Sequence, residues 1–231
     1  MKIPKIIHQT WKTQQIPYDI YKKEWADSWK KYHSDWEHRL WTDEDNRAFI
    51  KRYYPWFLRI YDRYKKNICR VDAVRYFILY HYGGVYVDLD FECLKNIEPL
   101  LDNHGLVFGR MGEDSAFSHS IPNAFMASAK RNPFWLVVMR ELILRRNENY
   151  VESATGSMML HKVIKSCDKN VWLKRIFNNK IKIYESSIFF PFDWRKSSIY
   201  GNTLDQGAIK DVAKNYPAAY AVTYWTHNWE D

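Results

Sequence analysis

The chain has 231 residues, 46% of them hydrophobic, and a formal net charge of +8, which is an ordinary composition for one folded domain with a sizeable core. No arginine-rich tail or zinc-finger spacing accompanies the positive charge, so we expect no nucleic-acid partner. The longest unbroken apolar run, residues 134–139, is too short to span a bilayer, which leaves only peripheral contact with a membrane open.

The first part of the chain alternates predicted strands and helices. The predicted elements are a strand, a helix and a second strand, over residues 5–11, 18–32 and 36–41. Three aromatic residues of the helix, Tyr21, Trp25 and Trp29, recur every four positions and therefore share one face. Thr42 is a plausible cap for a further helix, with Asp45 in the third position of a capping box.

The next predicted helix, residues 67–82, runs into Gly83, which we expect to end it in a left-handed conformation. A short apolar strand, residues 85–88, follows at once. The later predicted elements are a strand at 106–108, a helix at 133–146, a helix starting near 157, and strands at 181–184 and 188–190. Alternating strands and helices indicate an α/β fold on a mostly parallel sheet, in which ligands bind beyond the carboxyl ends of the strands.

Asp88 and Asp90 stand at such a carboxyl end. Side chains at i and i+2 of an extended segment project to the same side, so we expect the two carboxylates to converge. Two close carboxylates repel unless a divalent cation lies beside them, and hard oxygen ligands suit Mg²⁺ or Mn²⁺. The acidic residues 43–45 repeat the pattern, but we assign them to a helix dipole rather than a metal.

Asp72 and Arg75 lie three residues apart on the preceding predicted helix and share a face. They have two interpretations. They form an ion pair within the helix, or the acid accepts hydrogen bonds from sugar hydroxyls while the guanidinium binds phosphate or sugar oxygens.

The segment "RVDAVRYFILYHYGGVYVDLDFE", residues 70–92, resembles the signature of the DXD-containing glycosyltransferase family 32. That family includes the fungal initiating α-1,6-mannosyltransferases and the inositol phosphoceramide mannosyltransferases, and the glucosylating bacterial toxins are more distant relatives. The positions that match are Asp72, Arg75, Tyr76, Gly83, Gly84, Tyr86, Asp88 and Asp90. Val71 departs from the pattern, because the family usually has serine there.

The resemblance extends beyond this segment. Residues 3–12 are similar to the family's first strand, residues 121–128 to its asparagine-containing strand and residues 154–160 to its Thr-Gly segment. By this resemblance the donor-binding residues are Ile7, His8, Thr10, Trp11, Asp72, Arg75, Tyr76, Asn123 and Trp229. The first four are expected to border the nucleoside.

Residues 221–229 resemble the family's C-terminal motif, with Trp229 as the closing tryptophan near the leaving diphosphate. Thr223 stands where the family usually has histidine. That departure leaves the third metal ligand between His227, which we favour, and Asn228.

The resemblance implies a GT-A type fold, a Rossmann-like α/β sandwich, as a single domain over residues 1–231. It implies retaining transfer of a hexose from a UDP- or GDP-sugar to a glycan or lipid-linked acceptor, with Mn²⁺ or Mg²⁺. Asp90 is expected to bind the metal directly. Asp88 is expected to bind the ribose directly and the metal through a water molecule, and Arg75 is expected to stabilise the leaving phosphate. Because no carboxylate nucleophile stands out, we expect attack from the same face, with the leaving phosphate taking the acceptor's proton.

Two other functions fit parts of the sequence. A sugar-binding module without turnover would explain the 17% aromatic content and the missing histidine at Thr223. A metal-dependent phosphodiesterase would also use paired acids, but no second cluster of carboxylates and histidines is evident.

Three widely spaced cysteines, Cys69, Cys93 and Cys167, indicate reduced thiols rather than a disulfide framework. The N-terminal residues contain no apolar stretch of signal-peptide length. We therefore expect a cytoplasmic protein of bacterial or viral origin.

Overall fold

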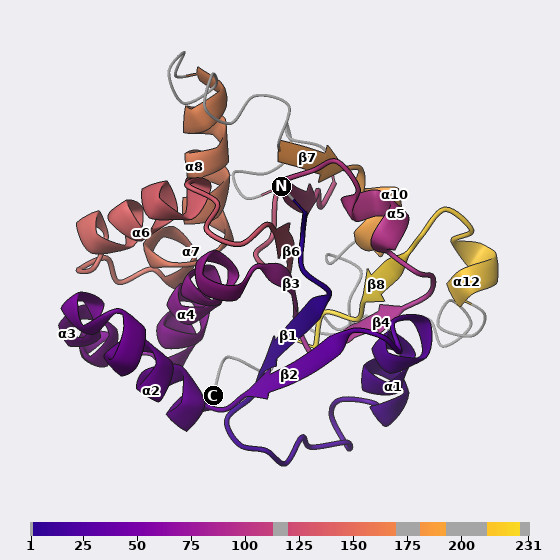
Figure 1. The fold of residues 1–231 in the computed structure, drawn as a ribbon, viewed down its shortest axis with the longest axis horizontal. Coiled ribbons are helices and arrows are strands. Elements are labelled where there is room, and N and C mark those ends of the chain that lie inside the picture. Colours follow the sequence, from indigo (N-terminus) through magenta and orange to yellow (C-terminus); the bar gives the residue numbers. More distant parts are fainter. Residues whose placement is uncertain (1, 113–119, 170–180, 193–211, 227–231) are drawn as a thin grey trace.

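The computed structural model describes residues 2–112, 120–169, 181–192 and 212–226, and its centre is a six-stranded sheet in the order β2-β1-β3-β6-β5-β7 (Figure 1). The strands are β1 (Ile6–Thr10), β2 (Glu37–Trp41), β3 (Gly84–Val87), β5 (Leu106–Gly109), β6 (Phe125–Ser128) and β7 (Ile181–Tyr184). Only β6 is antiparallel to its neighbours, β3 and β5, among the described pairs. The predicted α/β fold with a mostly parallel sheet is confirmed.

A second, antiparallel sheet joins β4 (Phe91–Cys93) to β8 (Ala221–Thr223), so the end of the described chain pairs with the segment after β3. The described helices are α1 (Lys23–Tyr32), α2 (Asp43–Tyr53), α3 (Pro55–Arg63), α4 (Asn67–Tyr82), α5 (Glu98–Leu101), α6 (Phe134–Leu144), α7 (Val151–Ala154), α8 (Ser157–Lys169), α10 (Ser186–Phe189) and α12 (Val212–Asn215).

Helices cover both faces of the central sheet (Figure 1). On one face α2, α3, α4, α6 and α8 bury a large core, which receives Tyr86 from the central strand β3. On the other face α1, α5 and α10 bury a second core, which receives the alternating side chains Val85 and Val87. A strand covered on both sides has no polar face, which is why β3 is apolar throughout.

Helix α4 has the predicted bounds, but Gly83 ends it differently from the prediction. Its φ of 70° and ψ of −160° lie outside the left-handed helical region, and the extended ψ sends the chain straight into β3. A side chain at this position would overlap the backbone nitrogen of Lys130, at 2.6 Å from an added Cβ. The glycine therefore permits both the sharp reversal and the close packing at the start of β3.

Two other predictions concern helix boundaries. The capping box is confirmed, since the Asp45 amide donates to the Thr42 hydroxyl at 3.1 Å and the Asp45 carboxylate accepts from the Thr42 amide at 3.0 Å. Helix α1 begins at Lys23 rather than residue 18, because residues 17–21 form a turn closed by the Tyr21 amide on the Pro17 carbonyl. The predicted aromatic face is nevertheless buried.

The predicted strand at residues 188–190 is wrong. Residues 186–189 form the short helix α10, and the Phe190 amide donates to the Ser186 carbonyl at 2.8 Å. The helical turn stacks Phe189 on Phe125 at 4.0 Å between ring centroids. Three apolar residues are too few to distinguish a strand from a helical turn by periodicity.

All three cysteines are free and buried. Among the residues with described structure, no helix combines the length and the apolar character needed to cross a bilayer.

Candidate active site

Asp88 and Asp90 lie in a turn between β3 and β4, at the carboxyl ends of β1 and β3. Strand β3 ends at Val87, and the Phe91 amide donates to the Asp88 carbonyl at 3.3 Å, so the segment is not extended as predicted. The two carboxylates still interact, since burial first and then the neighbouring Asp88 raise the pKa of Asp90 to about 6. The two carboxylates are therefore brought together by a turn, and not by the alternation of side chains along a strand that was predicted.

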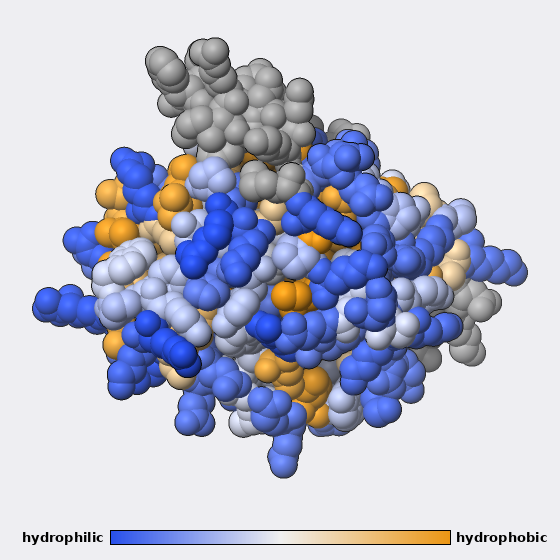
Figure 2. Space-filling view, viewed as in Figure 1, coloured by the Kyte–Doolittle hydropathy of each residue, from blue (hydrophilic) through white to orange (hydrophobic). Residues whose placement is uncertain are grey.

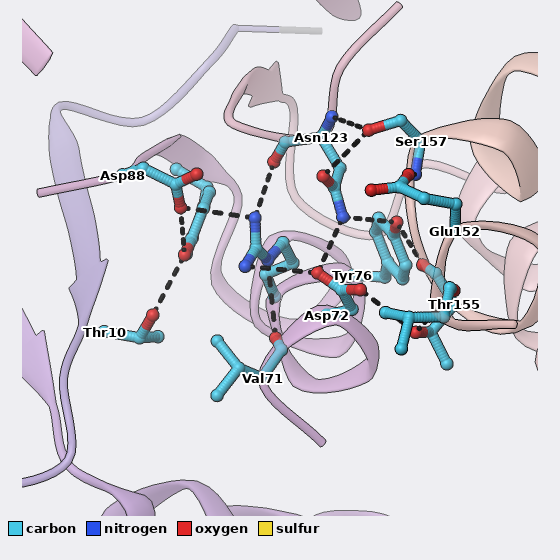
Figure 3. Close-up of polar contacts among 12 residues, drawn as sticks. Thr10, Val71, Asp72, Tyr76, Asp88, Asn123, Glu152, Thr155 and Ser157 are labelled. Carbon is cyan, nitrogen blue, oxygen red and sulfur yellow. Dashed lines mark hydrogen bonds and ion pairs between the residues drawn. The ribbon is translucent and has the colours of Figure 1, made fainter. Parts of the chain in front are cut away.

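Asp88 is held from two sides at Oδ1. The Arg75 Nη1 donates to it at 3.2 Å and the Tyr86 hydroxyl at 2.8 Å, and the Tyr86 hydroxyl also lies 2.9 Å from the Thr10 hydroxyl (Figure 3). A third of the Asp88 side chain, 34%, remains exposed. Burial raises the pKa of Asp88, and Arg75 and Tyr86 oppose that rise by stabilising the anion.

Arg75 is almost completely buried, with 3% of its surface exposed. Its guanidinium binds the Asp72 carboxylate at 3.3 Å, the Asn123 carbonyl at 3.0 Å and Asp88, and it stacks on the Tyr86 ring at 4.4 Å. The structure therefore contains the ion pair within the helix that the sequence left as one interpretation. It adds a second carboxylate partner, Asp88, that spacing alone did not indicate.

Asp72 anchors a buried polar cluster (Figure 3). The Asn123 amide donates to Oδ1 at 2.9 Å, and the Thr155 hydroxyl donates to Oδ2 at 3.0 Å. The Tyr76 hydroxyl accepts from Asn123 at 3.1 Å and donates to the Thr155 carbonyl at 2.7 Å. Burial raises the pKa of Asp72 to about 6 although Arg75 lowers it. Four residues that were predicted to bind the sugar donor, Asp72, Arg75, Tyr76 and Asn123, thus meet in one network, and Thr155 joins them.

Two further residues of this network were not predicted. The Ser157 hydroxyl donates to Asn123 Oδ1 at 3.3 Å, and the Ser157 amide, at the start of α8, donates to the Glu152 carboxylate at 3.0 Å. Thr155 and Ser157 belong to the Thr-Gly segment, so the resemblance pointed to their region. Nothing in the sequence pointed to Glu152.

Asp90 is tied to the last described residues of the chain. Its Oδ2 accepts from the Thr226 amide at 3.0 Å, and its carbonyl accepts from the Tyr224 amide at 3.0 Å. Thr223 pairs with Phe91 across the small sheet, and its hydroxyl also stabilises the Asp90 anion. The residue that replaces the family's usual histidine is therefore a neighbour of the acidic turn.

The expected third metal ligand, His227, its alternative, Asn228, and the closing Trp229 lie outside the described residues. Within the described part of the chain, no group of three His, Cys, Asp or Glu side chains is arranged to hold a metal. The two carboxylates fit a hard divalent cation, because such ions bind through one or two carboxylates together with water and substrate phosphates.

Of the four predicted nucleoside-binding residues, Ile7, His8, Thr10 and Trp11, only Thr10 joins the network. His8 is fully buried, with Nε2 donating to the Gly83 carbonyl at 2.9 Å and Nδ1 accepting from the Trp41 indole at 3.2 Å. Burial lowers the pKa of His8 to about 4, so the ring is neutral and fastens β1 to its neighbours. Ile7 lies in the core, and Trp11 packs edge-to-face on Tyr21 at 5.1 Å. Ile7 and His8 therefore stabilise the sheet and are not part of the proposed site.

Replacing Arg75 by methionine is expected to lower the free energy of unfolding by about 3–5 kcal/mol, because two carboxylates lose their buried cation. Chemical denaturation measures the loss. Arg47→Met is the matched control, since Arg47 pairs with Asp62 at 2.8 Å on the surface, and its loss should be much smaller. Equal losses for the two variants would contradict the assigned importance of the buried network.

The fold and the acidic turn define the class of protein: a GT-A type α/β domain with a DXD turn at the carboxyl edge of its sheet. Residues 21–106 match the family described as "Glycosyltransferase sugar-binding region containing DXD motif". This part of the chain is similar to the DXD-containing glycosyltransferases, and the predicted resemblance to the fungal members is confirmed.

Two fungal relatives illustrate the similarity. Inositol phosphoceramide mannosyltransferase 3 of Schizosaccharomyces pombe is 48% identical over 61% of this chain and 37% of its own length. Mannosyl phosphorylinositol ceramide synthase CSH1 of Saccharomyces cerevisiae is 37% identical over 79% of this chain and 47% of its own length. The chain thus spans less than half of either relative. The expected bacterial or viral origin is not supported, since both relatives are fungal.

Among solved structures, the PaToxG glycosyltransferase superposes with a TM-score of 0.55 at 17% identity, covering 95% of this chain and 89% of that one. At this identity the likeness establishes the fold alone, and it confirms the GT-A type.

Proposed function

We propose that this chain transfers a hexose from a nucleoside diphosphate sugar to an acceptor hydroxyl, with a divalent cation at Asp88 and Asp90. The observation that carries the proposal is the acidic turn itself. Buried Arg75 and Tyr86 hold Asp88 from one side and Thr226 holds Asp90 from the other, at the sheet edge where α/β folds bind ligands.

The cation, when bound to Asp90 and Asp88, would neutralise charge on the departing diphosphate. Arg75 and Tyr86 fix the orientation of Asp88, and in this proposal Arg75 acts chiefly through that carboxylate. Mn²⁺ and Mg²⁺ both suit the oxygen ligands, with His227 as the proposed third protein ligand.

The cluster around Asp72 would orient the donor sugar through Asn123 and Tyr76. The nearby carboxylates are already engaged in contacts. Asp72 binds Arg75 and Thr155, and the Glu152 carboxylate accepts a hydrogen bond from the Ser157 amide at 3.0 Å. Their engagement supports same-face attack, in which the acceptor oxygen bonds to the anomeric carbon as the phosphate oxygen leaves with the acceptor's proton. The anomeric configuration would be retained.

The relatives' names suggest the substrates. Both describe transfer of mannose to an inositol phosphoceramide, so we propose mannose as the hexose and a phosphoinositol-bearing lipid as the acceptor class. The donor is then a UDP- or GDP-sugar.

The test supplies the protein with Mn²⁺, a panel of UDP- and GDP-hexoses and inositol phosphoceramide, and measures nucleoside diphosphate release and lipid glycosylation. We expect turnover with one donor that ends when EDTA is added. Mn²⁺-dependent nucleotide binding without any turnover would instead indicate a sugar-binding module. Release of mononucleotides from nucleic acid would indicate a phosphodiesterase.

Cation binding is expected to depend on pH through Asp90. A carboxylate binds the cation only when ionised, and burial raises the pKa of Asp90 to about 6, so protons compete with the cation below that value. The affinity for Mn²⁺ should be constant above about pH 7 and fall about tenfold per pH unit below about pH 6. Calorimetric titration in the presence of a nucleoside diphosphate measures it, and an affinity that does not change between these values would contradict the assignment.

A further inference from the structure

The later part of α2, helix α3 and the two lysines that follow carry a dense positive charge, whereas the first turn of α2 is acidic, with Asp43, Glu44 and Asp45. Between residues 47 and 66 the sequence has seven basic residues and one acidic residue, Asp62. The basic residues are Arg47, Lys51, Arg52, Arg59, Arg63, Lys65 and Lys66. Asp62 is already paired with Arg47, at 2.9 and 2.8 Å. The remaining six basic side chains are all exposed, so no acid within this segment balances their charge.

Large aromatic side chains are exposed within the same segment. Trp56 is 54% exposed and Tyr53 is 40% exposed. The spacing of Trp56, Arg59 and Arg63 puts them on the outer face of α3, while Phe57 and Tyr61 on another face are buried in the core. A helix face that combines basic residues with tryptophan is typical of segments that lie in the interfacial layer of a membrane.

A groove of about 660 Å³ adjoins this face, between the edge strand β2 and helix α2. Its lining includes Arg52, with its guanidinium 5.2 Å from the Tyr53 ring, and Arg39, with its guanidinium 4.5 Å from the Tyr82 ring. Arg39 is already paired with Glu37, and the acidic Asp45 also lines the groove, so Arg52 is the cation of the lining that remains for a phosphate. Trp41 and Phe49 complete the aromatic part of the lining. Guanidinium groups bind phosphate, and a volume of this size accommodates a lipid headgroup.

We propose that the outer face of α2–α3 and this groove form a membrane-contact surface for bilayers that contain anionic phospholipid. The lipid phosphate lies against Arg52 in the groove, while Tyr53 and Trp56 enter the interfacial layer. Charge complementarity favours this occupant, because the cytoplasmic faces of membranes are negatively charged and attract clustered basic residues. In Figure 2, strongly hydrophilic side chains project from the surface over α2 and α3.

The surface is distinct from the acidic turn, which lies at the carboxyl ends of β1 and β3, and its function requires no turnover. A lipid-linked acceptor would nevertheless make it useful, since attachment keeps the enzyme at the surface that holds its substrate. Failure of membrane binding and failure of the proposed transfer reaction are therefore separate results.

The test is flotation of the whole chain with vesicles of phosphatidylcholine alone or mixed with phosphatidylinositol. We expect binding only to the anionic vesicles, and weaker binding as salt increases. The double variant Arg52→Gln/Arg59→Gln should lower the partition coefficient about 30-fold. Each basic residue near an anionic surface contributes about 1 kcal/mol of binding free energy, and the variant removes two such residues.

The matched control is Lys30→Gln/Lys31→Gln, which removes the same charge from exposed positions on α1, across the molecule from α3 (Figure 1). It should leave vesicle binding unchanged. A second pair tests the aromatic contact: Trp56→Ala should weaken binding, and Tyr150→Ala, which removes an aromatic side chain that is 63% exposed elsewhere, should not. Equal losses in test and control variants, or no binding to anionic vesicles, would overturn the proposal.

Discussion

Asp90→Asn is expected to reduce Mn²⁺-dependent transfer by at least about a hundredfold while leaving the fold intact. The amide keeps an oxygen for the Thr226 backbone donor but loses the negative charge that binds the cation. The pKa of Asp90 is about 6 in the folded protein, against an ordinary value of 3.8, so folding disfavours the anion at neutral pH. The variant should therefore be as stable as the wild type, or more stable by up to about 2 kcal/mol.

Nucleoside diphosphate release measures the activity and thermal denaturation measures the stability. Asp27→Asn is the control, because Asp27 is exposed on α1 and pairs only locally with Lys23 at 2.8 Å. It should change neither quantity. If Asp90→Asn kept full cation-dependent turnover, the acidic turn would not be the metal site.

Gly84→Ala is expected to lower the free energy of unfolding by about 3 kcal/mol or more. Gly84 has a φ of 95°, which side chains rarely adopt, and an added Cβ would lie 2.5 Å from the Ile6 carbonyl oxygen and 3.2 Å from His8 Nε2. Both neighbours belong to β1, so relief of the overlap would separate β1 from β3 and displace Thr10 from Tyr86. Activity should therefore fall together with stability.

Chemical denaturation measures the effect, with Gly156→Ala as the comparison. An added Cβ at Gly156 would lie 2.9 Å from the Glu152 carboxylate and 3.0 Å from the Glu152 Cα, but the backbone of Gly156 does not require a positive φ. The loss there should be clearly smaller. A Gly84→Ala protein of unchanged stability would show that β1 and β3 tolerate a wider separation than the structure indicates.

The segment from α4 to β3 was predictable because its signals are local. An uninterrupted helical stretch, two glycines and a β-branched run determine where α4 ends and β3 begins, and Thr42 with Asp45 determines where α2 starts. The carboxyl edge of the sheet then follows from the α/β pattern. These features require only neighbours in sequence.

The remaining features depend on residues that are far apart in the chain. Nothing in the pattern around Asp88 indicated that Arg75 would bridge it to Asp72, or that the acidic segment would form a turn. Glu152 closes the start of α8 through a contact that has no sequence signature. The short strands β4 and β8 are stable only as a pair, so neither was predicted.

The pairing of β4 with β8 also affects how the protein matures. Thr226, whose amide binds Asp90, is 136 residues further along the chain. At ribosomal speeds of about 10 residues per second, the donor emerges on the order of ten seconds after the carboxylate that it binds. A nascent chain can therefore assemble β1, β2 and β3 well before its acidic turn is complete. The contact that completes the acidic turn is thus one of the last that the described part of the chain acquires during its synthesis.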